Sequence, residues 1–221
     1  MNRLCLAFAC FVPFAVLAQG AAPEINEPYQ NPSYARWQRS FEVEGREVYE
    51  KRLAIVDAVA PRPGQALADV GAGTGLFTRL FAARVGPQGR VYAVDIARSF
   101  VEGNLERARA ERLDNVVGIV STQTDTRLEP ASVDLVFVCD AYHHFEDPPA
   151  MLASIRRALR PGGTLVMIDF ERIPGVTPDW LLRHVRAGKE EFRREIEAGG
   201  FRFAGEVKLM RENYFLRFTR D

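Results

Sequence analysis

The chain has 221 residues, which is enough for one domain with a sizeable core and hardly enough for two. Apolar residues make up 47% and charged residues 26%, a balance typical of a globular domain. The 29 basic and 29 acidic residues cancel, so the chain has no basic surplus to neutralise a phosphate backbone. This balance argues against nucleic acid as a partner and leaves small molecules open.

The first 20 residues have the pattern of a secretory signal peptide: a positive start at Arg3, an apolar run over 4–17 and small residues from Ala18. We expect cleavage after Ala18 or Gly20 and export to the periplasm, or a cytoplasmic protein if the signal is not used. A retained membrane anchor is the alternative. The run is shorter than the roughly 20 residues that cross a bilayer, and Pro13 interrupts it. We therefore expect no stable membrane span after cleavage.

Residues 21–40 follow as a proline-rich linker and an aromatic N-terminal segment, and residues 41–221 are expected to form the domain. The aromatic residues and a nearby arginine are candidates for a lid over a ligand, with a place in the core as the alternative; they are Tyr34, Trp37, Phe41 and Arg46. Cleavage leaves one cysteine, Cys139, in the apolar run VFVCD, where we expect a small buried hydrophobic side chain.

Short apolar runs then alternate with amphipathic stretches. The pattern predicts helices over 46–59, 76–84, 98–112, 149–159 and 189–198, and strands over 66–70, 90–96, 116–122, 133–140, 163–170, 201–210 and 214–219. Continuous Val, Ile and Leu runs indicate strands buried on both faces, hence a parallel sheet covered by helices. The last two strands have no helix between them and must be antiparallel. The prediction is a Rossmann-like α/β fold with a doubly wound, mostly parallel seven-stranded sheet and a C-terminal antiparallel hairpin.

A glycine-rich loop, DVGAGTG at 69–75, follows the first predicted strand. Glycines allow a sharp turn and a close approach of the backbone to a ligand. Asp95 ends the next strand, where a carboxylate can accept hydrogen bonds from both hydroxyls of a ribose. The spacing is G-x-G-x-G, not the dinucleotide pattern G-x-G-x-x-G. Asp69 before the loop suits a cationic group such as an amino acid's ammonium and would repel a pyrophosphate.

Taken together, the motifs resemble the class I S-adenosylmethionine-dependent methyltransferases, in particular the branch of ubiquinone- and menaquinone-type enzymes that act on small molecules. The matching segments lie within about 46–218 and are DVGAGTG at Asp69, VYAVD at Val91, VDLVF at Val133, YHHFEDP at Tyr142 and LRPGGTLVMID at Leu159. The alternative is a doubly wound domain that binds no cofactor.

The resemblance implies S-adenosyl-L-methionine as the cofactor. It implies that Asp69, Gly71 and Gly73 face the methionine end, that Asp95 holds the ribose and that Ile96 packs on the adenine. Where the family often has an acid after the third strand, this chain has Ser121-Thr122-Gln123. Thr122 or Gln123 would then accept the hydrogen bond from the adenine amino group. The other expected cofactor contacts are Ala72, Gly75 and Asp140.

Ligands of open α/β sheets lie outside the carboxyl ends of the strands, which places 140–145 beside the methyl group. Tyr142, His143 and His184 are the candidate catalytic residues, because histidine is poised to accept a proton near neutral pH. The alternative is that His143 or His144 only anchors the loop. We expect no metal site, since no other ligand has a spacing that fits the adjacent histidines.

The sequence thus predicts methyl transfer from S-adenosylmethionine to a small-molecule nucleophile by an exported enzyme, and leaves its oligomeric state open. One alternative is an exported S-adenosylmethionine-binding protein without catalysis. Another is a nicotinamide-dependent oxidoreductase, which the glycine spacing and Asp69 disfavour. Trivalent arsenic is not an expected acceptor, because its capture relies on several thiolates.

Overall fold

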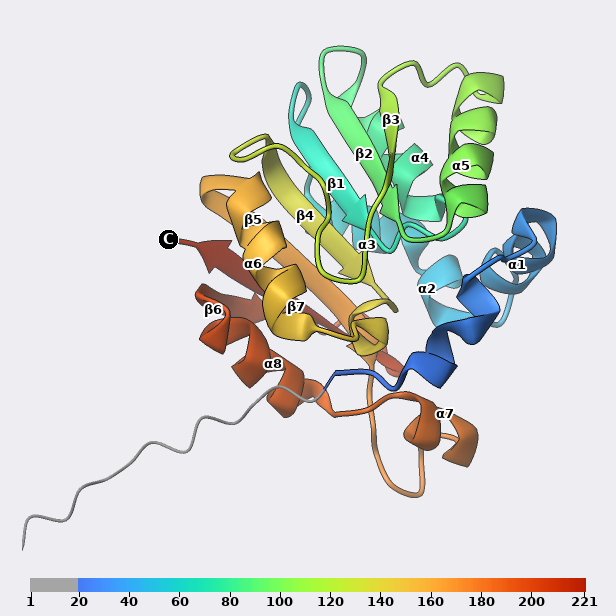
Figure 1. Cartoon of the computed structure of the whole chain (residues 1–221), viewed down its shortest axis with the longest axis vertical. Helices are drawn as coiled ribbons and strands as arrows, with labels where there is room; N and C mark the ends of the chain where they lie inside the picture. The colour runs from blue at the N-terminus through green and yellow to red at the C-terminus, as the bar shows by residue number, and fades with distance from the viewer. Residues whose placement is uncertain (1–19) are drawn as a thin grey trace, which may run out of the picture.

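The computed structural model describes residues 20–221, so the predicted signal peptide lies outside the described residues except for Gly20. A seven-stranded sheet with the order β3-β2-β1-β4-β5-β7-β6 forms the centre (Figure 1). Its strands are β1 Ala66–Val70, β2 Arg90–Asp95, β3 Val116–Val120, β4 Val133–Cys139, β5 Leu159–Phe170, β6 Phe201–Glu206 and β7 Asn213–Arg220. The first five pair in parallel, and β7 pairs antiparallel with both β5 and β6. The predicted fold class is confirmed.

Helices cover both faces of the sheet. Strand β4 shows why. Phe137 packs in a cluster with helices α3 (Arg52–Val59) and α4 (Leu76–Val85). Its neighbours Val136 and Val138 pack in a second cluster with α6 (Pro148–Ala158) and α8 (Lys189–Ala198). Successive side chains of a strand point to opposite faces, so a strand without polar alternation must be covered twice. The α-helices are α1 Tyr34–Phe41, α2 Glu47–Glu50, α3 Arg52–Val59, α4 Leu76–Val85, α5 Arg98–Ala110, α6 Pro148–Ala158, α7 Asp179–His184 and α8 Lys189–Ala198.

Several element boundaries differ from the prediction. The helix predicted over 46–59 is divided at Lys51, which has φ −88° and ψ 4°. Strand β5 begins at Leu159, not at Gly163, because Leu159 pairs with Val133. The sequence pattern did not predict α1, α7 or the two 3-10 helices, η1 Pro23–Tyr29 and η2 Tyr142–His144.

The segment predicted as a linker is packed against the domain. Its main chain is joined to the loop after η2, where the Ala21 amide donates to the Phe145 carbonyl at 2.8 Å. Farther along, the Asn26 side chain is buried. η1 and α1 therefore lie beside the carboxyl ends of the parallel strands, where Figure 1 shows them in blue. Within residues 20–221, no helix combines the length and apolar character that a membrane crossing requires.

Candidate active site

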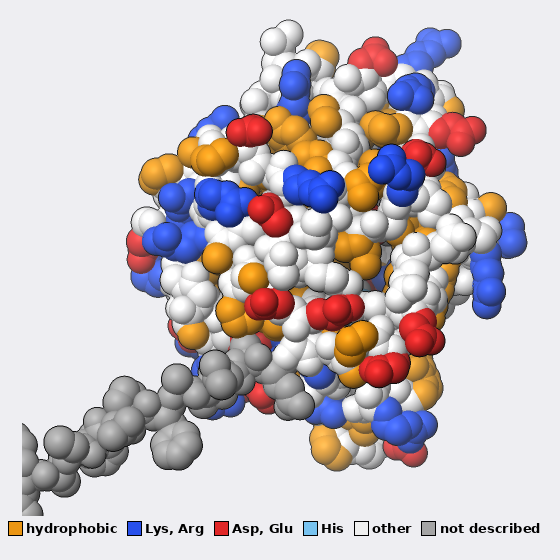
Figure 2. All heavy atoms as spheres, in the orientation of Figure 1, with side chains coloured by type: hydrophobic (Ala, Val, Ile, Leu, Met, Phe, Trp, Pro, Cys, Tyr) orange, Lys and Arg blue, Asp and Glu red, His pale blue; other side chains and the backbone are white. Residues whose placement is uncertain are grey.

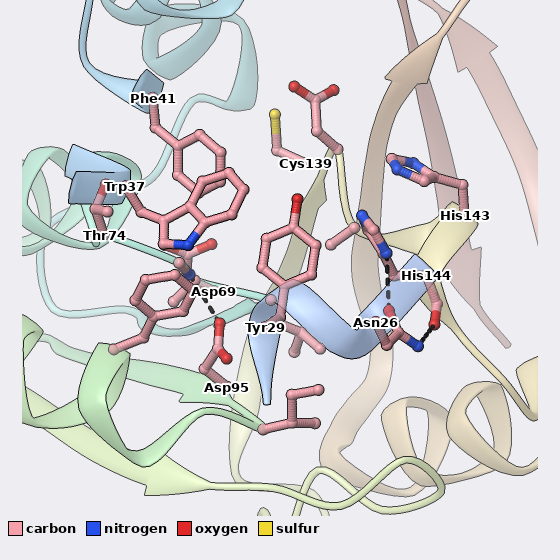
Figure 3. Close-up of a pocket in the computed structure, with 18 of the residues that line it drawn as sticks. Asn26, Tyr29, Trp37, Phe41, Asp69, Thr74, Asp95, Cys139, His143 and His144 are labelled. Carbon is pink, nitrogen blue, oxygen red and sulfur yellow. Dashed lines mark hydrogen bonds between the residues drawn. The ribbon is translucent and has the colours of Figure 1, made fainter. Parts of the chain in front are cut away.

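A cavity of about 440 Å³ opens at the carboxyl ends of β1, β2 and β4 (Figure 3). One end is formed by the glycine loop and Asp95, the other by a group of histidines, and η1 with α1 covers the space between. Its size is typical of small-molecule sites. The topology accounts for its position, because β1 and β4 are neighbours whose following chains leave in different directions, which opens a crevice at the sheet edge.

The glycine loop is tied to the sheet and leaves room for a ligand. The amides of Gly71 and Ala72 donate to the Val94 carbonyl at 2.8 and 3.1 Å. Gly71 has φ +74°, and a Cβ there would lie 2.4 Å from the Cβ of Ala141. Both conditions require glycine at this position. Asp69, Gly71, Ala72 and Gly73 line the cavity, as predicted.

Gly75, predicted to contact the cofactor, is not among the cavity-lining residues. It precedes α4 with φ +72°, and a Cβ there would overlap the side-chain oxygen of Asn104. Its contribution is the turn into the helix and the close approach of α5, not a ligand contact.

Asp95 lies at the floor of the cavity with both carboxylate oxygens held by the backbone. One accepts from the Gly73 amide at 2.8 Å and the other from the Ala97 amide at 2.9 Å. Burial raises the pKa of Asp95 to about 6, even though these hydrogen bonds oppose the rise. A carboxylate has about four acceptor sites, so the fixed group can still accept from a hydroxyl donor in the cavity.

A second buried acid, Asp69, accepts a 2.6 Å hydrogen bond from the Thr78 hydroxyl. Burial raises the pKa of Asp69 to about 7, and the nearby Asp95 contributes to the rise. Two buried acids without a cationic side chain bonded to either favour a ligand that brings a positive charge or several donors. This matches the requirement inferred from the sequence.

Asp140 lines the cavity where β4 ends, with φ +50°. Its carboxylate forms a 2.6 Å ion pair with Arg46 and accepts 2.7 Å from the Asn213 amide nitrogen. Burial raises its pKa, and Arg46 opposes the rise. Arg46 also donates to the Phe41 carbonyl at 3.1 Å. The pair therefore fixes the end of α1 against the sheet. Because Arg46 balances the charge of Asp140, this carboxylate adds no net negative charge to the cavity.

At the end of the cavity where adenine is expected, the lining differs from the prediction in one residue. Ile96, Ser121 and Gln123 line the cavity, but Thr122 does not. The Thr122 hydroxyl accepts instead from the amide of Asp125 at 3.0 Å. Thr122 therefore does not reach the cavity, and the residues on either side of it in the sequence line the space instead.

Aromatic rings cover the cavity. Trp37 lies 4.8 Å from Tyr29 and 4.9 Å from Phe41 between ring centroids, and all three line the space (Figure 3). Tyr34, predicted with them, is outside the lining; its hydroxyl donates to the Thr74 carbonyl at 2.8 Å. Tyr29 was missed because the proline-rich segment carries no periodic pattern.

Two of the three histidines at the far end are each held by a hydrogen bond to a second residue. Nδ1 of His143 lies 2.8 Å from Oδ1 of the buried Asp169, and Nδ1 of His144 lies 2.8 Å from Oδ1 of Asn26. His184 joins them from α7, with its ring centroid 5.1 Å from each of the other two. Burial, with the neighbouring imidazoles, lowers the pKa of His144 to about 2. Sequence reasoning located the three histidines and missed Asp169 and Asn26.

Tyr142, a predicted catalytic residue, does not reach the cavity. Its side chain points into the core beside Phe145 and Phe192, and its hydroxyl donates to Glu195 at 2.9 Å. Burial and the Glu195 carboxylate raise its pKa. η2 turns adjacent side chains in different directions, so His143 faces the cavity while Tyr142 faces away.

Comparisons with known proteins support the assignment of this cavity. Residues 68–167 match the family described as a methyltransferase domain. Nocamycin O-methyltransferase of Saccharothrix syringae is 35% identical over 61% of this chain and 48% of its own length. A ubiquinone/menaquinone biosynthesis C-methyltransferase of Hydrogenovibrio crunogenus is 33% identical over 56% of this chain and 48% of its own length. The chain thus spans about half the length of these curated relatives.

Among solved structures, a SAM-dependent methyltransferase from Aquifex aeolicus has a TM-score of 0.75 and 21% identity, covering 86% of this chain and 99% of that one. At this identity the likeness shows the shared fold. The matched domain contains the glycine loop, Asp95 and Asp140, so the family match and the cavity coincide. Together with the named relatives, this supports a methyltransferase domain that uses S-adenosyl-L-methionine.

Proposed function

We propose that this protein transfers a methyl group from S-adenosyl-L-methionine to a small-molecule acceptor. The observation that carries the proposal is that one cavity is lined by the glycine loop and Asp95 at one end and by the histidines at the other. Gly71 and Gly73 leave backbone-lined space where side chains would intrude, and Asp95 presents fixed acceptors. The residues present therefore fit the cofactor that the family implies.

When bound, S-adenosylmethionine supplies a methyl group that leaves its sulfonium sulfur for the acceptor's nucleophile, while the electron pair of the broken bond stays on the sulfur. The protein contributes mainly positioning, which is worth several orders of magnitude in a two-reactant displacement. Asp95 and Asp69 would hold the ribose and the ammonium group. The aromatic rings of Tyr29, Trp37 and Phe41 would exclude water from above.

The acceptor would enter at the histidine end of the cavity. His143 and His184 line this end together with Phe170 and Trp180, so an apolar or aromatic molecule with one polar reacting atom fits best. We keep His143 and His184 as catalytic candidates, with Asp169 as the residue that positions His143. Tyr142 is withdrawn, because its hydroxyl is bonded to Glu195 in the core.

The proposal also includes export. It is supported by the signal-type pattern of residues 1–20, which ends directly before Ala21. Figure 2 shows basic and acidic side chains interspersed over one face, a distribution that fits a small acceptor better than a phosphate backbone.

A turnover assay with a panel of phenols, quinols and other small nucleophiles tests the proposal. Formation of S-adenosylhomocysteine with one of them supports it. His184→Gln, at the partly exposed histidine, should then lower turnover by about 10²–10⁴-fold if the side chain takes part in the reaction. Binding of the cofactor without turnover toward any acceptor would favour a binding protein without catalysis.

A further inference from the structure

All three histidines of the sequence meet at one place in the fold. His143 and His144 belong to η2, directly after β4, and His184 ends α7, which follows β5. One ring nitrogen from each lies within 4.8 Å of those of the other two. No metal site was expected, because no third ligand is near the adjacent histidines in the sequence. The fold brings His184 to them.

The surroundings of His143 and His144 fix which nitrogen is free. The amide nitrogen of Asn26 donates to the His144 carbonyl and to Glu146, so its oxygen is the atom that faces Nδ1 of His144 and accepts a hydrogen bond from the ring N–H. The Asp169 carboxylate accepts in the same way from Nδ1 of His143. Each ring is left with an unprotonated Nε2. A ring N–H donated to a carboxylate or carbonyl oxygen is the arrangement found behind histidines that bind metals.

We propose that His143, His144 and His184 form a three-histidine site for a divalent transition metal ion at the acceptor end of the cavity. Imidazole nitrogens suit Zn²⁺ and its neighbours in the first transition row, and three such ligands leave a coordination position open. Zn–N bonds of about 2.0–2.1 Å require the nitrogens to approach more closely than the present spacing. Because His144 and His184 are partly exposed, rotation of these two rings is the movement that would close the gap.

The role of the ion rests on the proposed function. All three histidines line the cavity that also contains the glycine loop, so the open coordination position faces the acceptor. A cation there would bind an oxygen of the acceptor and favour its deprotonated form, with the proton released to solvent. With the ion bound, His143 and His184 would serve the reaction as metal ligands and not as the base. The site therefore points to a hydroxyl- or phenol-bearing acceptor.

Calorimetric titration of Zn²⁺ into the chelator-treated full chain, without a polyhistidine tag, tests the site. We expect one ion per chain, and a visible spectrum of bound Co²⁺ without a sulfur charge-transfer band. His184→Gln should weaken binding on the order of a hundredfold or more, and Asp169→Asn by about ten- to a hundredfold, because it replaces the carboxylate behind His143 by a neutral amide. Cys139→Ser is the matched control for a cavity-lining ligand atom outside the cluster, and should bind Zn²⁺ like the unchanged protein.

Failure of Zn²⁺ to bind, or equal binding by the unchanged chain and a folded His184→Gln variant, would overturn the site. Circular dichroism and thermal unfolding verify that each variant is folded. The titration needs neither acceptor nor S-adenosylmethionine, so its failure leaves methyl transfer untouched. Conversely, S-adenosylmethionine binding by the chelator-treated protein tests the proposed function without the metal.

Discussion

Asn26 forms two hydrogen bonds with His144, one of 2.8 Å to ring nitrogen Nδ1 and one of 3.0 Å to the main-chain carbonyl. The first residue belongs to η1 and the second to η2, so these bonds tie the N-terminal cover to the carboxyl edge of the sheet. A third bond, of 2.8 Å, links Asn26 to Glu146. One buried side chain thus contributes three of the hydrogen bonds that hold the cover at its inner face.

Asn26→Ala should detach this cover. Loss of a buried side chain with three partners leaves polar groups unsatisfied, at about 1–3 kcal/mol of unfolding free energy. Urea unfolding measures the loss, and S-adenosylmethionine binding should weaken because Tyr29 lies in the same helix. Glu24→Gln, at an exposed position of η1, serves as the matched control. Equal stability of the two variants would show that the hydrogen bonds do not hold η1.

Cofactor affinity should decrease as the pH falls below about 6. Burial raises the pKa of Asp95 to about 6, and its carboxylate must be ionised to accept from both ribose hydroxyls. Below that pH the free protein is mostly protonated at this site, and each further pH unit costs about tenfold in affinity. We expect S-adenosylmethionine to bind at least about tenfold more weakly at pH 5 than at pH 8.

The same titration on Asp95→Asn and Asp69→Asn separates the two acids. Burial raises the pKa of Asp69 to about 7, so its contribution should disappear at a higher pH than that of Asp95. Asp95→Asn should keep only the part of the pH dependence that belongs to Asp69. An unchanged pH profile in both variants would contradict the assignment of these acids to the cofactor.

Gly71→Ala should abolish cofactor binding, and Gly162→Ala should not. Both glycines have a positive φ, +74° and +75°, so the backbone strain of about 1–2 kcal/mol is shared. Only at Gly71 would the new methyl group collide with Ala141, at 2.4 Å, and intrude into the cavity. Thermal unfolding should show a larger loss for Gly71→Ala than for Gly162→Ala, because only the former adds the collision to the shared backbone strain. Normal S-adenosylmethionine affinity in Gly71→Ala would refute the close-approach argument.

Export is tested by fusing residues 1–30 to a reporter that is active only outside the cytoplasm. The fusion should give a signal, and the same fusion without residues 4–17 should not, since the apolar run drives targeting. Mass spectrometry of the exported full chain should find its N-terminus near Gln19 or Ala21. An intact Met1 on a cytoplasmic protein would contradict export.

The cofactor half of the site could be predicted from the sequence because its chemistry is local. The glycine loop and Asp95 end consecutive parallel strands, and Asp69 is paired with Ala93 in the sheet, so strand order alone brings them together. The parallel pairing follows from the buried runs and the antiparallel end from the terminal hairpin, whereas the order of the strands was not predicted.

The acceptor half depends on contacts between distant segments, which no short pattern records. Asn26 and Asp169 hold His144 and His143 from η1 and β5. Orientation within a short turn was equally hidden: Tyr142 and His143 are adjacent, yet one lies in the core and the other faces the cavity. Thr122 differs from Ser121 and Gln123 for the same reason.

Calorimetric titration of the purified protein with S-adenosylmethionine, S-adenosylhomocysteine and NAD tests whether the cavity is a site for S-adenosylmethionine. We expect S-adenosylmethionine and S-adenosylhomocysteine to bind at one site and NAD not to bind. Asp95→Ala should weaken their binding roughly ten- to a hundredfold, because it removes charge-assisted hydrogen bonds worth about 1.5–3 kcal/mol. Binding of NAD without binding of S-adenosylmethionine would contradict the account.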